Sequence, residues 1–318
     1  MAFSYSNLSR KHTSKEKNRL PPELLREIVR FYSNQNTTLD TLDQDHAISS
    51  KPPWQLFSSL SSTSKALRAL ALGSWFAIFV VRHVDDLLDS NIPFPEIKTS
   101  WTREIHFIHW PEGLQFSIVE NFMRLSKIRI DCSKADVVPP TKESNGPLSL
   151  KDIELEIRNL YWPSPLVTQY ISRTFPTLRI LRLRQTRTWC GLCHTCCIPE
   201  FQPPLPTVIR YEGGTGLPTH YAQALSPLEY LEAVYLDVGV VASGKTTLSS
   251  HEGRNPDFWI GECDRCIEVM YEDESFRKEW LAKKKNPAVK PPRLTTVEWS
   301  FLSKEDFDSS SWSDDSEE

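Results

Sequence analysis

Hydrophobic residues near the N-terminus recur at helical spacing. Between residues 20 and 32 they form two overlapping series with steps of three and four residues: Leu24, Ile28 and Phe31, and Leu25, Val29 and Tyr32. Such spacing is typical of an amphipathic helix, whose first turn can accommodate Pro21 and Pro22. The apolar stripe is wider than one small core needs. It can therefore contact both its own domain and a partner, although an ordinary amphipathic helix also explains the spacing.

From residue 97 onward a second pattern returns: an apolar residue, two others, an apolar residue, one other, and an apolar residue. Clear copies begin at Leu125, Leu150, Leu178, Leu231 and Leu294. With weaker copies included, the middle positions fall at residues 105, 128, 153, 181, 209 and 234, at intervals of 23 to 28 residues. Leucine-rich repeats have periods of about 20–29 residues, each with one short strand. The even intervals favour such a repeat over the alternative, the unrelated amphipathic strands of an α/β domain.

Residues that alternate with the core positions of such strands would line one face of a stack of parallel strands. They combine both charges with aromatic character, which suits a protein or peptide partner better than a polyanion. A merely solvated sheet face is the alternative for any single residue. The partner-binding residues predicted on this concave face are Arg129, Glu156, Arg182, Arg184, Arg210 and Tyr235.

Residues 20–82 also combine several features of a known helical motif. The features are Leu20-Pro21, Glu23, Leu24-Leu25 and Ile28, followed by Leu60-Ser61, Ser64–Arg68 and Trp75-Phe76. Together they resemble an F-box, here with a polar insertion at 33–53. The resemblance implies a helical module at 20–85 that docks on the Skp-type adaptor of a cullin–RING ubiquitin ligase. The docking contacts that it implies are Leu20, Pro21, Leu24, Leu25, Ile28 and Leu60.

The predicted architecture is an N-terminal helical F-box-like module followed by an irregular leucine-rich-repeat solenoid at 97–302, an α+β or α/β repeat fold. The step from residue 234 to residue 297 is longer than two repeats, so a cysteine-containing insertion is expected at about 239–290. The net charge of −4 is uneven: a basic tail at 1–19 carries +4 and an acidic tail at 303–318 carries −6, both expected to be disordered. The remaining −2 argues against nucleic acid as the main partner.

Composition narrows the class of protein further. The most apolar run, residues 69–81, spans 13 residues, fewer than the roughly 20 that a membrane helix needs, so no membrane partner is expected. Seven cysteines without a secretory signal indicate reduced thiols in the cytoplasm or nucleus. Catalytic signatures such as GxSxG and HExxH do not occur, so the chain is not expected to be an enzyme.

One segment has the residue pattern of a phosphate-binding motif but lacks the helix that the motif requires. Gly239–Thr246 fits GxxxxGK[ST] and follows a strand-like run. That motif needs a helix directly after its lysine, to direct backbone amides at phosphate. Here Gly253 and Pro256 follow closely and preclude a long helix. A surface loop is therefore favoured over nucleotide binding.

Six of the seven cysteines fall in two clusters, Trp189–Cys197 (WCGLCHTCC) and Cys263–Cys266 (CDRC). Each has CxxC spacing, and two such turns complete a tetrahedral zinc site. We expect zinc bound by Cys263, Cys266 and two of Cys190, Cys193 and Cys196; inert buried thiols and redox chemistry remain alternatives. The order of Cys190–Ile198, Gly213–Ser226 and the later GECxxC is similar to that of fungal F-box-like proteins with degenerate leucine-rich repeats.

The leading functional prediction is a substrate-recognition adaptor of a cullin–RING ubiquitin ligase. Its N-terminal module would recruit the ligase, and the repeat domain would bind an unidentified target protein. The alternative from another class is a zinc-stabilised repeat scaffold for protein–protein interaction unrelated to ubiquitin. A nucleotide-binding protein that uses Gly239–Thr246 is the third alternative.

Overall fold

The computed structural model describes residues 21–35, 51, 54–109, 116–132, 150, 152–160, 163–197, 200–201, 208–239, 241–242 and 263–302. Several sequence predictions fall outside these ranges. They are both tails, most of the polar insertion at 33–53, Leu20, and residues 240 and 243–246 of the phosphate-loop match.

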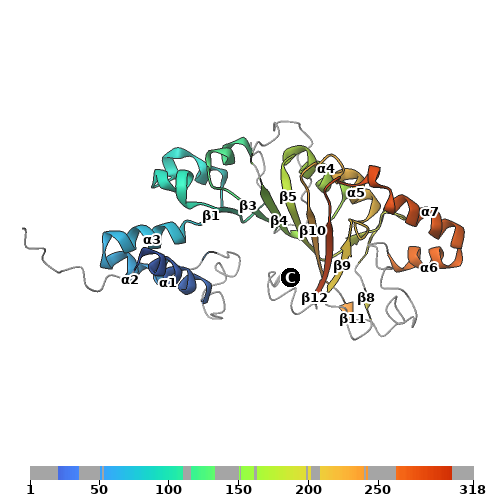
Figure 1. Cartoon of the computed structure of the whole chain (residues 1–318), viewed down its shortest axis with the longest axis horizontal. Coiled ribbons are helices and arrows are strands. Elements are labelled where there is room, and N and C mark those ends of the chain that lie inside the picture. The colour runs from blue at the N-terminus through green and yellow to red at the C-terminus, as the bar shows by residue number, and fades with distance from the viewer. Residues whose placement is uncertain are drawn as a thin grey trace, which may run out of the picture.

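An eight-stranded mixed sheet forms the centre of the molecule (Figure 1). Its strands, in spatial order, are β1 (Ile78–Val81), β2 (Glu104–Phe107), β3 (Lys127–Asp131), β4 (Ile153–Leu160), β5 (Leu178–Gln185), β10 (Ala233–Gly239), β12 (Thr296–Leu302) and β9 (Val208–Glu212). Neighbouring strands are parallel except that β9 pairs with β12 in the antiparallel sense. The fold is thus an α/β arrangement around a mostly parallel sheet.

This arrangement corrects the predicted fold class. The chain is not an F-box-like module followed by a leucine-rich-repeat solenoid. A solenoid adds its strands in chain order, whereas here β10 pairs directly with β5 and β9 crosses to the far edge, beyond β12. The recurring apolar pattern marks parallel strands that are buried on one face, and any α/β sheet of this kind has the same pattern. The alternative of amphipathic strands in an α/β domain was the right one.

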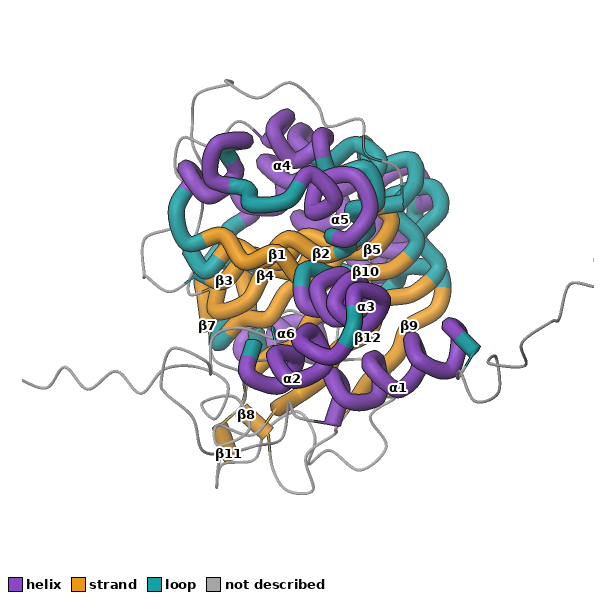
Figure 2. The backbone as a smooth tube through the Cα atoms, turned by 90° about the vertical axis from the view of Figure 1, so that its left-hand side faces the viewer, coloured by secondary structure: helices purple, strands orange, loops and turns teal. Residues whose placement is uncertain are grey.

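The main hydrophobic core lies between the sheet and a layer of helices. Figure 2 shows α4 (Pro165–Thr174) and α5 (Thr219–Leu225) together on one face of the sheet. Alternate strand residues point into this core, among them Ile105, Ile128, Leu155, Leu181 and Val234, all fully buried. The shorter helical segments are η3 (Val84–Leu87), η4 (Asp89–Asn91), η5 (Ile97–Trp101), η6 (Phe116–Asn121) and η9 (Pro287–Val289).

Three helices precede the sheet and lie at one end of it, at the left of Figure 1. They are α1 (Pro22–Gln35), α2 (Gln55–Thr63) and α3 (Lys65–Trp75), here called the helical unit. The unit has a core of its own, in which Val29, Phe57 and Ala71 are buried. Ser64 caps α3, since its side chain accepts a hydrogen bond from the backbone amide of Leu67 at 3.2 Å. A helical element in this region is therefore observed, although the fold that follows it differs from the prediction.

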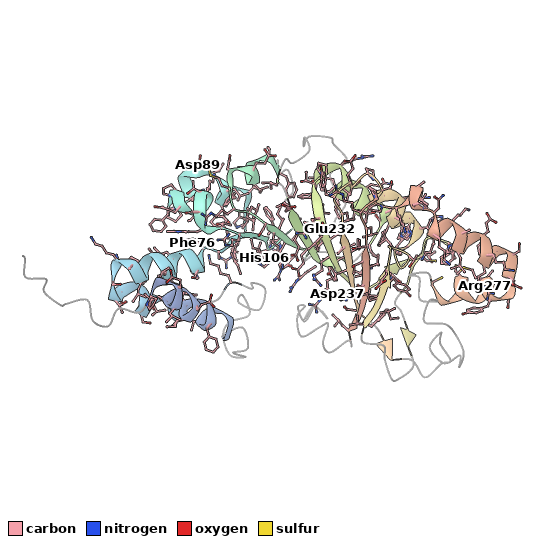
Figure 3. The ribbon with its side chains drawn as sticks, in the orientation of Figure 1. Phe76, Asp89, His106, Glu232, Asp237 and Arg277 are labelled. Atoms are coloured by element: carbon pink, nitrogen blue, oxygen red, sulfur yellow. The ribbon has the colours of Figure 1, made fainter. Side chains whose placement is uncertain are left out.

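A group of aromatic rings joins the helical unit to the sheet. This aromatic joint consists of Trp75, Phe76, Phe94 and Trp101. The Phe76 ring lies 4.7 Å from Trp75, 6.2 Å from Phe94 and 5.9 Å from Trp101, between ring centroids. α3 ends at Trp75 and β1 begins at Ile78, so the connection itself is very short. Figure 3 shows Phe76 where the helices meet the sheet.

Two further helices extend from the opposite end of the sheet, α6 (Asp264–Glu272) and α7 (Glu274–Lys285). They are here called the distal hairpin. Four short strands lie nearby: β6 (Thr188–Trp189) pairs with β7 (Cys196–Cys197), and β8 (Glu200–Phe201) pairs with β11 (Val241–Ala242). Across the part of the chain described above, no helix combines the length and the apolar character needed to span a membrane.

Candidate functional site

A tight turn brings Cys190 and Cys193 together between β6 and β7. The amide of His194 donates to the Cys190 carbonyl, and the amide of Cys190 donates to the Thr195 carbonyl, each at 2.9 Å. His194 has a φ of 55°, the left-handed conformation that closes such a turn. The turn therefore directs two thiols, three residues apart, to the same side of the chain.

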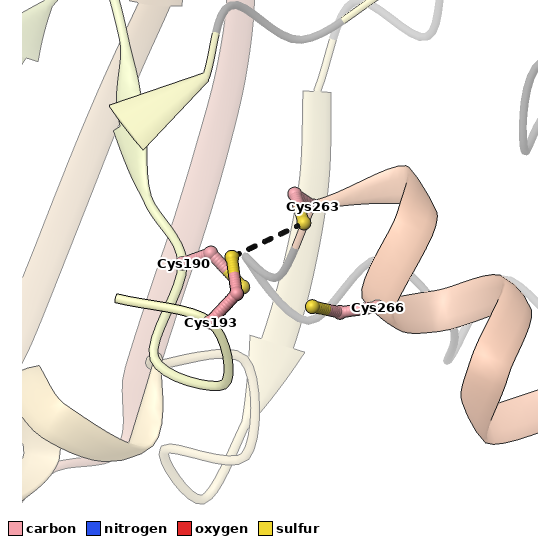
Figure 4. A group of neighbouring side chains, drawn as sticks. All are labelled: Cys190, Cys193, Cys263 and Cys266. Atoms are coloured by element: carbon pink, nitrogen blue, oxygen red, sulfur yellow. Dashed lines mark hydrogen bonds between the residues drawn. The ribbon is translucent and has the colours of Figure 1, made fainter. Parts of the chain in front are cut away.

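The second pair of thiols comes from the beginning of α6. Cys263 is the N-cap residue of this helix, and Cys266 lies one turn later. Residues three apart on a helix share a face, so both sulfurs point in the same direction. Figure 4 shows the two pairs facing each other, with the Sγ atoms of Cys193 and Cys263 3.6 Å apart.

All four sulfurs lie within 4.8 Å of one another, so Cys190, Cys193, Cys263 and Cys266 can hold a metal ion. A tetrahedral Zn²⁺ with bonds of about 2.3 Å requires sulfurs about 3.8 Å apart, which the cluster reaches with a small contraction. Four sulfur donors suit zinc or another thiophilic ion and leave no open coordination position. The side chain of Cys196 lies outside the described residues; its backbone belongs to β7, paired with Trp189. The prediction left the upstream pair open, and the turn geometry brings Cys190 and Cys193 to the cluster.

The burial of the four thiols is unequal. Cys190 is fully buried, Cys263 and Cys266 are half-buried, and Cys193 is exposed. Burial raises the pKa of Cys266 to about 12, although its hydrogen bond with Cys263 opposes the shift. Binding of a cation to Cys266 as a thiolate would therefore release a proton at neutral pH.

The cysteine cluster lies where the distal hairpin meets the rest of the molecule. A small hydrophobic cluster fills this junction, with Met270 and Trp280 buried and Leu192, Tyr271 and Leu281 packed against them. Leu192 belongs to the cysteine turn, so the turn contributes both sulfur donors and apolar contact area. Apart from this cluster the hairpin is strongly charged, particularly along α7.

A second candidate site is the outer surface of α1. The side chains of Leu24, Ile28 and Phe31 are 51%, 47% and 61% exposed, although all three are large and apolar. Val29 points the other way and is buried in the helical unit. Among the other predicted docking residues, Pro21 is exposed, Leu25 is half-buried and Leu60 packs against the core of the unit. Leu20 is not among the described residues.

The third candidate is the face of the sheet that α4 and α5 do not cover, here called the polar face. Strand register aligns one residue from each of seven strands in a row across it: His106, Arg129, Glu156, Arg182, Tyr235, Glu298 and Arg210. All six residues predicted for the concave face point to this side, because Arg184 lies two positions after Arg182 on the same strand. Figure 3 labels His106 and Asp237 on this side of the molecule.

The part of the polar face on β2, β3 and β4 is closed by internal ion pairs. Arg129 donates two hydrogen bonds to Asp131, of 3.0 and 2.8 Å, and His106 Nε2 lies 2.7 Å from the same carboxylate. Burial would raise the pKa of Asp131, but its hydrogen bonds to His106 and Arg129 outweigh this effect and lower it. The exposed fraction of Arg129 is 6%.

Glu156, next to this group, is enclosed in the same way, with an exposed fraction of 3%. Lys127 lies 2.6 Å from its carboxylate, and Arg158 donates to it as well. Burial opposes ionisation of Glu156, yet Arg158 and Lys127 lower its pKa to about 2. Arg129 and Glu156 were predicted to bind a partner; in the structure both are enclosed and bind neighbouring side chains.

The part of the polar face on β5, β10, β12 and β9 is more open. Arg182 is half-buried, stacks 4.3 Å above the ring of Tyr235 and lies 4.0 Å from Asp237. Arg184 is also half-buried. Burial lowers its pKa, and repulsion from Arg158 lowers it further. Arg210, on the edge strand, is exposed and paired with Glu298 at 2.6 Å.

Sequence reasoning did not find the aromatic joint or the His106–Asp131 pair. Trp75 and Phe76 were noted for their motif alone, while Phe94 and Trp101 lie in segments without a clear period. Asp131 directly follows the apolar pattern of β3, and a carboxylate at such a strand end was an available signal. No protein-family model matches this chain, and no curated protein or solved structure matches it either.

Proposed function

We propose that this chain is a non-enzymatic adaptor that docks on a partner protein through α1 and presents the polar face of its sheet to a target. The observation that carries the proposal is the exposed series Leu24, Ile28 and Phe31. These residues stand at positions i, i+4 and i+7 of one helix. That is the spacing with which an amphipathic helix fills a hydrophobic groove of a partner.

The energetics favour a protein partner for this face. Burying a leucine, isoleucine or phenylalanine side chain stabilises an interface by about 1.5–3 kcal/mol each. The helical unit buries Val29 on the opposite side of α1, so it retains its own core while the outer face binds. A helix that served its own domain alone would not need three large apolar residues in water.

The resemblance of residues 20–82 to an F-box supports the Skp-type adaptor of a cullin–RING ubiquitin ligase as this partner. Under this proposal the chain works in the cytoplasm or nucleus, where such ligases and reduced thiols are found. A scaffold unrelated to ubiquitin is the alternative, and it differs in the partner that α1 binds.

The test is a binding measurement between the purified chain and a purified Skp-type adaptor. We expect the wild type to bind and the double variant Leu24→Asp/Ile28→Asp to lose binding by at least 100-fold, because two carboxylates would be buried without partners. Leu166→Asp is the matched control: Leu166 is 58% exposed on α4, away from α1, and its replacement should leave binding unchanged. Failure of the wild type to bind, with both variants folded by circular dichroism, would refute the ligase adaptor.

For the target, the open part of the polar face supplies the residue types that dominate protein interfaces. Arginine and tyrosine are enriched among such residues, and Arg182 already stacks on Tyr235. Arg210 adds an exposed guanidinium at the edge of the sheet. We infer that Arg182, Tyr235 and Arg210 contact the target, while Arg129 and Glu156 stabilise the sheet beneath it.

For the cysteine cluster, we propose one structural zinc ion held by Cys190, Cys193, Cys263 and Cys266. Four thiolate ligands leave no site for water or substrate, which is typical of structural rather than catalytic zinc. The ion would fix the distal hairpin to the turn between β6 and β7. Elemental analysis of chain purified under reducing conditions should find about one zinc per chain, and its absence would refute the proposal.

A further inference from the structure

We propose that Cys193 and Cys263 form a peroxide-sensitive thiol pair, which closes to a disulfide and displaces the metal from the cluster. Their sulfurs lie 3.6 Å apart and come from elements 70 residues apart in the chain. A disulfide has an S–S bond of about 2.05 Å, so a movement of roughly 1.5 Å joins them. Cys193 lies in a turn and Cys263 is the N-cap residue just before α6, so the movement does not require a shift within a regular element.

Access selects Cys193 as the thiol that reacts first. It is exposed, whereas Cys190 in the same turn is fully buried. Its sulfur also lies 2.8 Å from the hydroxyl oxygen of Thr195, and either atom can be the donor in this contact. An accessible thiol beside a second thiol is the arrangement in which oxidation ends in a disulfide.

Cys132 provides the contrast within the same chain. It lies in the main hydrophobic core, where burial followed by the charge of Asp131 raises its pKa to about 12. Neither peroxide access nor a thiolate is available there. Reaction at Cys193 would therefore be selective with respect to this cysteine.

The chemistry balances with a peroxide as the oxidant. The Cys193 thiolate attacks one peroxide oxygen, the O–O bond breaks, and after proton uptake the products are a Cys193 sulfenic acid and one water. The Cys263 thiolate then attacks the sulfenic sulfur, the S–O bond breaks, and the hydroxide that leaves takes up a proton to become a second water. Two thiols are oxidised by two electrons in total, and one peroxide is reduced to two waters.

The disulfide would replace the metal as a crosslink in the same place. Cys190 and Cys266 alone cannot complete a tetrahedral site, so a bound ion would be lost. The distal hairpin would nevertheless stay attached, because the new bond also joins the β6–β7 turn to the start of α6. Oxidation and chelation therefore have different consequences: both remove the metal, and oxidation keeps the hairpin in place.

The experiment treats the full chain with hydrogen peroxide and maps its disulfides by mass spectrometry of proteolytic peptides. We expect the main crosslinked peptide to join Cys193 to Cys263, with release of one metal equivalent to a metallochromic dye. Cys193→Ser should abolish that crosslinked peptide, and the matched control Cys132→Ala should retain it. The peptide map of the wild type decides the matter even if a variant fails to fold.

A main product that joins Cys190 to Cys193, or Cys263 to Cys266, would overturn the proposal, and so would a chain whose thiols all survive treatment. Because the pair is defined by sulfur geometry, its outcome is separable from that of the zinc site. A Cys193–Cys263 disulfide in a chain that binds no metal would support the thiol pair and refute the zinc. Metal release without this disulfide would support the zinc site and refute the thiol pair.

Discussion

The helical unit and the distal hairpin extend from opposite ends of one sheet, and different forces hold them there (Figure 1). The helical unit has a core around Phe57 and is joined to the sheet by the aromatic joint. Among the described side chains of the distal hairpin, Met270, Trp280 and Lys284 are buried, and four thiols cluster at its base. Apolar area thus fixes the helical unit, whereas the zinc ion proposed above would fix the distal hairpin by a crosslink.

The difference determines which surfaces remain available. Since the inner side of α1 and the aromatic joint hold the helical unit in place, the outer side of α1 can expose Leu24, Ile28 and Phe31. The hairpin is charged along α7, with Glu274 in its first turn and Lys283, Lys284 and Lys285 in its last, in agreement with the helix dipole. The proposed docking on an apolar groove would use the exposed side of α1, and the proposed metal would attach the charged hairpin through its cysteines.

The largest effect is expected from a cavity in the helical unit. Phe57→Ala removes a fully buried ring and should cost about 3–5 kcal/mol, enough to unfold a unit of this size. Hydrogen exchange should then increase in α1, α2 and α3 while the distal hairpin stays protected. The control is Phe276→Ala on α7, where the ring is more than a third exposed and the cost should be about 1 kcal/mol or less. Loss of protection at both ends would show that the two attachments are not independent.

Metal removal should increase hydrogen exchange in the distal hairpin and not in the helical unit. The proposed metal would close a loop of about 70 residues, and a crosslink of that span stabilises a chain by up to about 4 kcal/mol in the entropic model. A chelator under reducing conditions should lower Tm and increase exchange in α6 and α7, while α1, α2 and α3 keep their protection. Equal exchange before and after chelation at the hairpin would contradict the role of the cysteine cluster as its attachment.

A smaller effect should follow mild acidification. Burial, then the proximity of His194 and Lys284, lowers the pKa of His220 from 6.5 to about 3. Below pH 6.5 the unfolded chain therefore binds a proton that the folded chain excludes, and stability falls as pH decreases, by less than about 1.4 kcal/mol per pH unit. Denaturant titrations from pH 7 to pH 5 should show this slope in the wild type and a smaller one in His220→Gln.

The His220 comparison also separates the two ends. The sequence of α1, α2 and α3 contains no histidine, so His220→Gln should leave the pH dependence of protection in the helical unit unchanged. Acid also protonates thiolate ligands, but this contribution is shared by the wild type and His220→Gln. An identical slope in the two chains would exclude His220 as the cause.

Much of the secondary structure was predictable from the sequence. Strands occur around each predicted centre, from Ile105 in β2 to Val297 in β12, because alternation with an apolar face is a local property. The order of the strands was not predictable, because the position of β9 depends on its pairing with β12, 84 or more residues further along the chain. Even spacing along the chain therefore says where strands lie and not which strands are neighbours.

The candidate sites, like the fold, were predictable from the sequence only in part. The thiol-rich clusters were visible from their spacing, whereas the preference for Cys190 and Cys193 depends on the left-handed turn at His194. Arg129 and Glu156 alternate correctly with the core residues, yet burial of both depends on Asp131, Lys127 and Arg158 from their own and adjacent strands. A pattern of alternation gives the direction of a side chain and leaves its neighbours undetermined.

The aromatic joint has a consequence for geometry at the scale of a complex. Two residues separate α3 from β1, and rings from both sides interlock around Phe76, so α1 and the polar face share one fixed frame. A flexible tether would spread a bound target over a large volume and dilute its effective concentration near the docked partner. A rigid connection would instead keep the proposed partner on α1 and the proposed target on the sheet at a single separation and orientation. The length of the sheet would then set the distance between the partner on α1 and the target on the polar face.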